Sequence, residues 1–139
     1  MKITDMPRRA RLRKVVEPPR FKGYRPYGVN AKKRDSIDLH YDEYEAIKLA
    51  DYDFMKHDEA AKVMGISRPT FARIYESARR KIAEALVETK NINTVYGNAI
   101  MDKDWFVCKK CHARFNIPKG MESGKCPACK SDNIELLNQ

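Results

Sequence analysis

Four cysteines near the C-terminal end are the residues whose types and spacing most directly indicate chemistry. Two residues separate Cys108 from Cys111 and Cys126 from Cys129, and fourteen residues separate the two pairs. Two such pairs can supply the four corners of a tetrahedron around one metal ion. The separation is just below the usual range of about 15 to 20 residues for this arrangement. We therefore predict one structural zinc ion per chain, held by four thiolates.

The segments around the cysteines predict short strands at 105–107, 113–117 and 133–137. The run Cys-Pro-Ala-Cys at 126–129 resembles the second knuckle of zinc-ribbon domains. The residue after each pair, His112 or Lys130, is expected to take a positive φ. His112 is not expected to bind the metal, because four thiolates already complete the site. Iron is the less favoured metal, and it would make this region a redox module. A protein-interaction role for the cysteine site also stays open.

A second pattern, in residues 37–90, predicts a helix-turn-helix. Apolar periodicity indicates helices at 41–51, at 58–64 and at about 67–87. Gly65 can supply the left-handed residue of a sharp turn, and Ser67 is a good N-cap for the third helix. Three helices with such a turn are typical of DNA-binding proteins.

The third helix has one apolar stripe, which is expected to face the core: Phe71, Ile74, Tyr75, Ala78, Ile82 and Ala85. The opposite face is free to enter a DNA groove. Arg73 is the leading candidate for reading bases, because a guanidinium can make two hydrogen bonds to guanine. Arg68 and Thr70 could contact bases or phosphates, Arg80 could bind a phosphate or remain solvated, and Ser67 is a cap first and a DNA contact second.

Positive charge is concentrated at the N-terminal end, where residues 1–34 hold twelve basic and two acidic groups in a chain of net charge +9. Because Lys and Arg release counterions when they bind phosphates, this arm favours a polyanion partner, and double-stranded DNA is the predicted one. The candidate contacts of the arm with the phosphate backbone or a minor groove are Arg8, Arg9, Arg11, Arg13 and Lys14. The aromatic residues Phe21, Tyr24 and Tyr27 could fold over the helical core. Alternatively they could stack on bases, which would indicate RNA or single strands.

Residues 45–51, 59–61, 64–71 and 77–86 resemble a family of small, basic prokaryotic proteins that are predicted to bind DNA and have no characterised function. The resemblance covers roughly residues 6–90, and it implies a helix-turn-helix like the fourth region of sigma factors. This chain departs from the family pattern at Phe54 and Lys56, where the family usually has Gly and a Ser or Thr cap. The start of the second helix is therefore expected to be less well capped.

Together these patterns predict a mainly α protein. The expected order is a basic N-terminal arm rich in Pro and aromatic residues (1–36), a helix-turn-helix domain (37–90), a linker (91–103) and a zinc ribbon (104–139). We find no catalytic constellation, and the carboxylates are expected to lie on a solvent face, so no enzyme is predicted. We expect a cytoplasmic, sequence-specific transcriptional regulator without a membrane partner, which could also form a homodimer or contact the transcription machinery.

Overall fold

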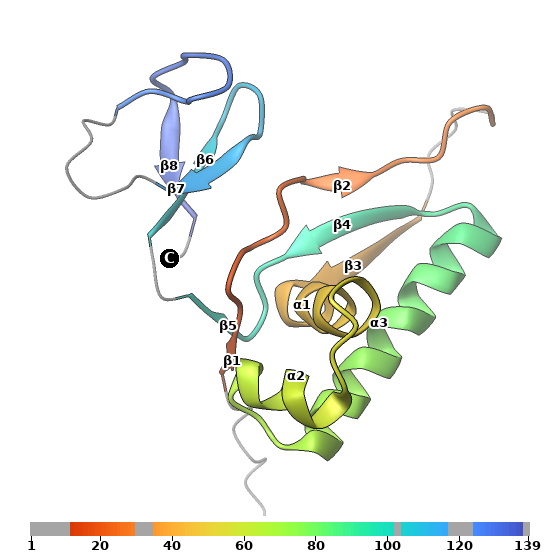
Figure 1. Ribbon diagram of the computed structural model, residues 1–139. Coiled ribbons are helices and arrows are strands. Elements are labelled where there is room, and N and C mark those ends of the chain that lie inside the picture. The colour runs from red at the N-terminus through yellow and green to blue at the C-terminus, as the bar shows by residue number, and fades with distance from the viewer. Residues whose placement is uncertain (1–11, 30–34, 102–103, 117–123, 138–139) are drawn as a thin grey trace, which may run out of the picture.

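The computed structural model describes residues 12–29, 35–101, 104–116 and 124–137 (Figure 1). Its helical elements are α1 (Tyr41–Ile47), the π-helical turn η2 (Lys48–Tyr52), α2 (His57–Met64) and α3 (Arg68–Glu88). The strands before them are β1 (Arg13–Lys14), β2 (Gly23–Tyr24) and β3 (Ser36–His40). The strands after them are β4 (Asn91–Val95), β5 (Ala99–Ile100), β6 (Trp105–Cys108), β7 (Arg114–Asn116) and β8 (Ile134–Leu136).

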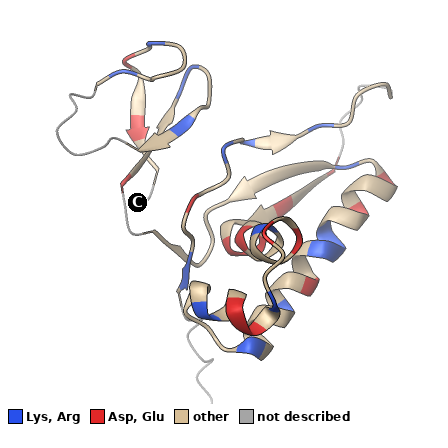
Figure 2. Cartoon of the chain, viewed as in Figure 1, with Lys and Arg blue, Asp and Glu red and all other residues tan. Residues whose placement is uncertain are grey.

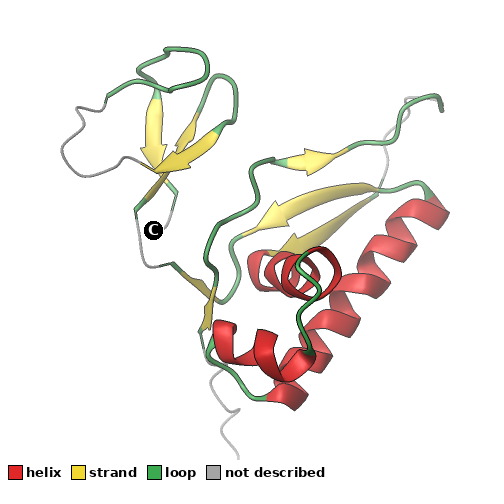
Figure 3. Cartoon of the chain, in the orientation of Figure 1, coloured by secondary structure: helices red, strands yellow, loops and turns green. Residues whose placement is uncertain are grey.

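The prediction of a mainly α protein is wrong, because the described residues also form three sheets (Figure 3). The strand orders are β1-β5, β2-β4-β3 and β7-β6-β8. In β3, Ile37 and Leu39 are buried while Ser36 and Asp38 are exposed, which is the alternation of a half-buried strand. Only the third of these sheets lies in the region where strands were expected.

Residues 91–103 were expected to be a linker, but β4 and β5 occupy much of this segment. β4 is the central strand of its sheet, because it pairs in parallel with β3 and antiparallel with β2. Ile92 lies opposite both Ile37 and Tyr24. β5 pairs in parallel with β1, so segments from both sides of the helices are joined by backbone hydrogen bonds.

The helices α2 and α3 and the turn between them lie where the sequence predicts the two helices and the turn of a helix-turn-helix. Gly65 ends α2 in the left-handed conformation at φ 68°, where a residue without Cβ has no steric penalty. The backbone N–H of Thr70 donates to Ser67 Oγ at 3.3 Å, so Ser67 is the N-cap of α3. Phe71 is fully buried and packs in one cluster with Leu49, Met64 and other residues of all three helices. Of the predicted apolar stripe, four residues are buried and two are partly buried.

A second cluster joins the helical part to the cysteine-containing part. Trp105, at the start of β6, packs with Val15, Tyr41, Ala99 and Met101. The helical part and the cysteine part therefore share a core at their junction.

Arg114 of β7 makes a second junction between the same two parts. Its guanidinium donates from Nη1 to the carbonyl oxygen of Pro19 at 3.0 Å and to Thr94 Oγ1 at 3.2 Å. It also lies over the ring of Tyr41, 5.6 Å from the centroid.

No helix in the described part of the chain has the length and hydropathy needed to cross a membrane.

Candidate metal centre and nucleic-acid interface

The four cysteine sulfurs come together, as predicted, where Cys108 ends β6 and the other three cysteines lie in the segments that connect the strands of the third sheet. All four Sγ atoms lie within 4.8 Å of one another. The Sγ–Sγ distance is 3.6 Å between Cys108 and Cys129 and 3.5 Å between Cys111 and Cys126. Each of these two distances therefore joins a residue of one pair to a residue of the other, so the two knuckles face each other.

Backbone N–H groups favour the thiolate at the first cysteine of each pair. The N–H groups of Cys111 and Lys110 both donate to Cys108 Sγ at 3.4 Å, and these hydrogen bonds lower the pKa of the Cys108 thiol to about 6. The N–H groups of Cys129 and Ala128 similarly lower the pKa of the Cys126 thiol. The thiolate is the form of cysteine that binds a metal ion. The peptide backbone therefore prepares one ligand in each knuckle.

The turns after the two pairs have the predicted positive φ, with values of 64° at His112 and 65° at Lys130. His112 N–H donates to the carbonyl oxygen of Cys108, and Lys130 N–H donates to that of Cys126, both at 2.9 Å. His112 is exposed and does not belong to the group of cysteine ligands. The donor set is thus four sulfurs without an open position, which fits a structural metal site.

The first turn of α3 carries a short hydrogen-bonded series of side chains. Ser67 Oγ donates to Thr70 Oγ1 at 2.9 Å, and Arg73 Nη2 donates to the same oxygen at 3.2 Å. Arg73 is exposed, as predicted from the rotation of the helix, and so is Arg68. Arg68 has no hydrogen bond or ion pair within the described ranges. The N-terminal end of α3 therefore presents two accessible cations.

Further along α3 the cations are paired with carboxylates. Arg80 Nη2 lies 2.8 Å from Glu76 Oε1. Arg79 Nε lies 3.9 Å from Asp51 Oδ2, and its guanidinium lies 5.2 Å from the centroid of the Tyr75 ring. Figure 2 shows basic residues along α3 and acidic residues gathered on α1. Free positive charge is thus greater at the start of α3 than in its middle.

The predicted arm contacts are only partly visible, because Arg8, Arg9 and Arg11 lie outside the described residues. Arg13 is mostly buried, with 15% of its side chain exposed, and its Nε lies 3.9 Å from Asp42 Oδ2. The neighbouring Lys14 is exposed and runs along the turn of the helix-turn-helix, since a Cβ on Gly65 would lie 3.9 Å from its stem. Of the two residues of β1, Lys14 is therefore the accessible cation.

The carboxylates of α1 were expected on a solvent face, and this expectation is wrong for Asp42, Glu43 and Glu45, which are all buried. Glu43 Oε1 accepts from Lys81 Nζ at 2.7 Å and from the His40 N–H at 2.9 Å, and its Oε2 accepts from Ser77 Oγ at 2.6 Å. Burial alone would raise its pKa, but the hydrogen bonds from Lys81, Ser77 and the His40 backbone hold the pKa below its usual value. Glu43 thus ties α1 to α3.

The pKa of Glu45 is shifted in the direction opposite to that of Glu43. Its Oε2 accepts from the Val16 N–H at 2.5 Å, and Lys48 Nζ lies 3.5 Å from Oε1. Burial raises the pKa of this carboxyl. A sequence signal for its burial exists, because Glu45 lies four residues from both Tyr41 and Leu49 and so shares their buried helix face.

Known proteins resemble this chain over nearly its whole length. The model of the family described as "Protein of unknown function DUF134" matches residues 4–102. The chain belongs to this family. A UPF0251 protein of Chloroherpeton thalassium is 42% identical over 130 residues, covering 94% of this chain and 86% of that protein. A UPF0251 protein of Methanothermobacter thermautotrophicus is 39% identical over 133 residues, covering 96% of this chain and 69% of that protein.

The DUF134 match and the matches to whole proteins differ in extent. The DUF134 segment includes the helix-turn-helix, β4 and β5, and it ends before the first cysteine. An alignment over 94% of the chain leaves fewer than ten residues outside, so the likeness to the Chloroherpeton protein continues across the cysteine segment.

Proposed function

We propose that this DUF134 protein binds double-stranded DNA in a sequence-specific manner and acts as a transcriptional regulator. The observation that carries the proposal is the turn at Gly65, from which α3 starts with one face in the core and Arg68 and Arg73 exposed on the other. In helix-turn-helix proteins, residues near the N-terminus of the second helix contact base edges in the major groove. The accessible cations of α3 lie in this same part of the helix.

Arg73 is the side chain to which we assign base reading. Its hydrogen bond to Thr70, which Ser67 supports in turn, limits the positions of the guanidinium before DNA binds. A guanidinium held in this way loses less conformational entropy on contact with guanine. Lys14 and Arg68 are assigned to phosphates, because they are exposed and flank the same turn.

We assign zinc to the four-cysteine site, where it would be held by Cys108, Cys111, Cys126 and Cys129. Zinc supplies structural cross-linking in such a closed site, and it leaves no ligand position for catalysis. The ribbon packs through Trp105 against Val15, which follows β1, and it is hydrogen-bonded through Arg114 to Thr94 of β4. The site is therefore proposed to stabilise the DNA-binding part and not to carry out a reaction.

The test is selection of bound sequences from a random duplex library, followed by binding of the selected duplex and a scrambled duplex. Arg73→Ala should weaken binding to the selected duplex by about 1–3 kcal/mol and leave the scrambled duplex nearly unchanged. The matched control Arg80→Ala removes an arginine that Glu76 already pairs, and it should affect both duplexes equally and weakly. Equal losses on both duplexes with Arg73→Ala would contradict the proposed reading role.

The dependence on salt tests the type of partner. With about six phosphate contacts per chain, the logarithm of the binding constant should fall with the logarithm of salt concentration with a slope of about −5. Tighter binding to single-stranded RNA than to any selected duplex would overturn the proposal in favour of a single-strand binder.

A further inference from the structure

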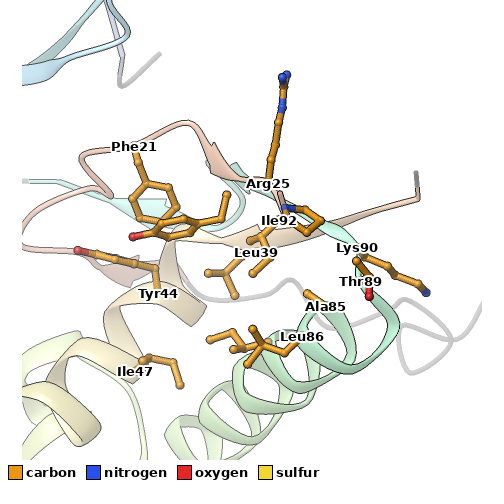
Figure 4. A pocket seen from close by; sticks show the side chains of 13 residues that line it. Phe21, Arg25, Leu39, Tyr44, Ile47, Ala85, Leu86, Thr89, Lys90 and Ile92 are labelled. Carbon is orange, nitrogen blue, oxygen red and sulfur yellow. The ribbon is translucent and has the colours of Figure 1, made fainter. Parts of the chain in front are cut away.

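An apolar cavity of about 450 Å³ lies between the segment around β2 and helices α1 and α3 (Figure 4). Phe21 covers one side, Leu39 of β3 and Tyr44 of α1 line the middle, and Ala85 and Leu86 of α3 form the opposite wall. Small-molecule sites have volumes of about 300–1,000 Å³ and mostly apolar walls with few polar groups. The cavity has the dimensions and the lining of such a site.

Two of the described residues that line the cavity are charged, and both are cations. They are Arg25 and Lys90, whereas no Asp or Glu occurs among the lining residues that the structure describes. Lys90 Nζ is 2.8 Å from Glu84 Oε2 and 3.4 Å from Glu88 Oε1, so its charge is offset. Arg25 is exposed and forms no ion pair with any residue that the structure describes, and Figure 4 shows its side chain pointing away from the apolar lining. Its guanidinium is thus unpaired by carboxylates of the described residues, and it would have to turn toward the cavity to meet a ligand with one negative charge.

Aromatic rings define the shape of the ligand that fits. The ring centroids of Phe21 and Tyr24 are 4.6 Å apart, and those of Phe21 and Tyr44 are 6.1 Å apart. Rings at such separations offer faces and edges to a further planar ring. Because Tyr24 is 63% exposed, the aromatic wall can be reached from solvent.

We propose that this cavity binds a planar aromatic acid as a small-molecule effector, with the ring system among Phe21, Tyr44 and Leu39 and the acid group toward Arg25. Binding itself does not depend on the proposed DNA function. An effect of the ligand on DNA affinity does rest on the proposed DNA function. The last turns of α3 form one wall of the cavity, and the first turn of the same helix carries the proposed reading residues. A ligand that favours one position of α3 shifts DNA affinity by the difference in its own affinity for the two positions.

The probes are 8-anilinonaphthalene-1-sulfonate, which is anionic, and N-phenyl-1-naphthylamine, its uncharged counterpart, titrated into the full chain without DNA. We expect one saturable site for each probe. Leu86→Glu should weaken both probes at least tenfold, because it places a carboxylate in the apolar wall. Val87→Glu is the matched control, because it adds the same charge at a residue that is 82% exposed and is not part of the lining. This variant should change the affinity for neither probe more than twofold.

A third variant tests the charge preference. Arg25→Gln should weaken the anionic probe at least fivefold and leave the uncharged probe unchanged. Equal weakening of both probes would overturn the assignment of an acid, and absence of saturable binding would overturn the site.

The other possible occupant is a second copy of the chain, because Leu86 is itself 75% exposed. Sedimentation equilibrium distinguishes this case. A dimer that Leu86→Glu converts to a monomer, together with no probe binding, would overturn the ligand site. Addition of saturating anionic probe should change duplex affinity of the wild-type chain and not of Leu86→Glu. An unchanged affinity, with probe binding confirmed, would overturn only the effector role.

Discussion

Lys81 Nζ on α3 lies 2.7 Å from Glu43 Oε1 on α1, and the same ammonium group donates to the carbonyl oxygen of Asp38 at 2.8 Å. One side chain thus joins β3, α1 and α3. Because Glu43 is buried and Lys81 is only 30% exposed, water weakens this pair less than a surface ion pair. The contact holds the proposed recognition helix against the sheet.

Replacement of Glu43 by Gln should lower the free energy of unfolding at pH 7 by about 2 kcal/mol, the size expected for hydrogen bonds to a buried charge. Because the pKa of folded Glu43 lies below its usual value, its contribution is present above the unfolded pKa of about 4.3 and is lost as the pH falls. The difference between wild type and variant should therefore shrink between about pH 5 and pH 3. Urea denaturation across this range measures it, and a constant difference would contradict the ion pair.

Glu45→Gln is the matched control on the same helix. Burial raises the pKa of Glu45, so its contribution is present at low pH and is lost as the pH rises through the folded pKa. The amide oxygen of Gln can still accept the hydrogen bond from Val16 N–H. We expect this variant to be at least as stable as wild type at pH 7 and to lose that advantage toward pH 4, the reverse of Glu43→Gln.

Phe54→Gly should stabilise the protein by about 0.5–1 kcal/mol. Phe54 has φ 58°, and its side chain is 86% exposed, so the ring contributes little packing while its Cβ strains the backbone. The left-handed conformation costs a residue with Cβ about 1–2 kcal/mol, and the greater entropy of unfolded Gly offsets part of the gain. In thermal denaturation, Phe54→Ala is the control, since it removes the ring and keeps the Cβ. An equal gain in both variants would assign the effect to the ring.

Lys56→Ser should also stabilise the protein, by about 0.5–1 kcal/mol. Lys56 is the N-cap of α2, with extended backbone angles and no side-chain cap hydrogen bond. A Ser hydroxyl at this position can accept from a free N–H of the first turn. Since Lys56 and Phe54 lie on either side of Met55, the double variant with Phe54→Gly should show whether the two gains add, as independent sites do.

Removal of the proposed zinc ion should be detectable through Trp105, the single tryptophan of the chain, which is 6% exposed. If zinc holds the four cysteines as proposed, chelation should unfold β6, β7 and β8, because small metal-binding modules depend on their metal for folding. Trp105 would then leave the cluster that it forms with Val15 and Tyr41, so its fluorescence should shift to longer wavelength. An unshifted spectrum after complete loss of metal, measured by mass spectrometry, would contradict a structural role.

Arg13→Gln should mainly affect stability, and Lys14→Gln should mainly affect DNA binding. Arg13 is largely buried beside Asp42, so its loss leaves a buried carboxylate without its cation and should cost about 2 kcal/mol. Lys14 is exposed, and its substitution should change stability by less than about 0.5 kcal/mol. Duplex affinity at low salt should fall for Lys14→Gln. The reverse assignment in paired melting and binding curves would show that Arg13 is the DNA contact.

The helix-turn-helix and the cysteine cluster were predictable because their signals are local. The turn signal consists of Gly65 and Ser67, which are two residues apart. The apolar stripe of α3 is a regular helical repeat. Each cysteine pair spans one tight turn. The first two sheets depend on pairing between segments that are far apart in sequence, and their strands β1, β2 and β5 have only two residues each. Such short strands have no periodicity of their own, so the prediction of an arm and a linker missed them.

The parallel pairing of β3 with β4 determines when the sheet can form. Ser36 lies opposite Asn91, and the whole helical segment separates these two positions in sequence. Contacts between residues so distant in sequence form slowly, because a long loop must close before they are made. As the chain is synthesised from its N-terminus, α1, α2 and α3 are complete before their sheet has its central strand. The helix-turn-helix can therefore fold first, and β2 and β3 remain without a partner strand until β4 has been synthesised.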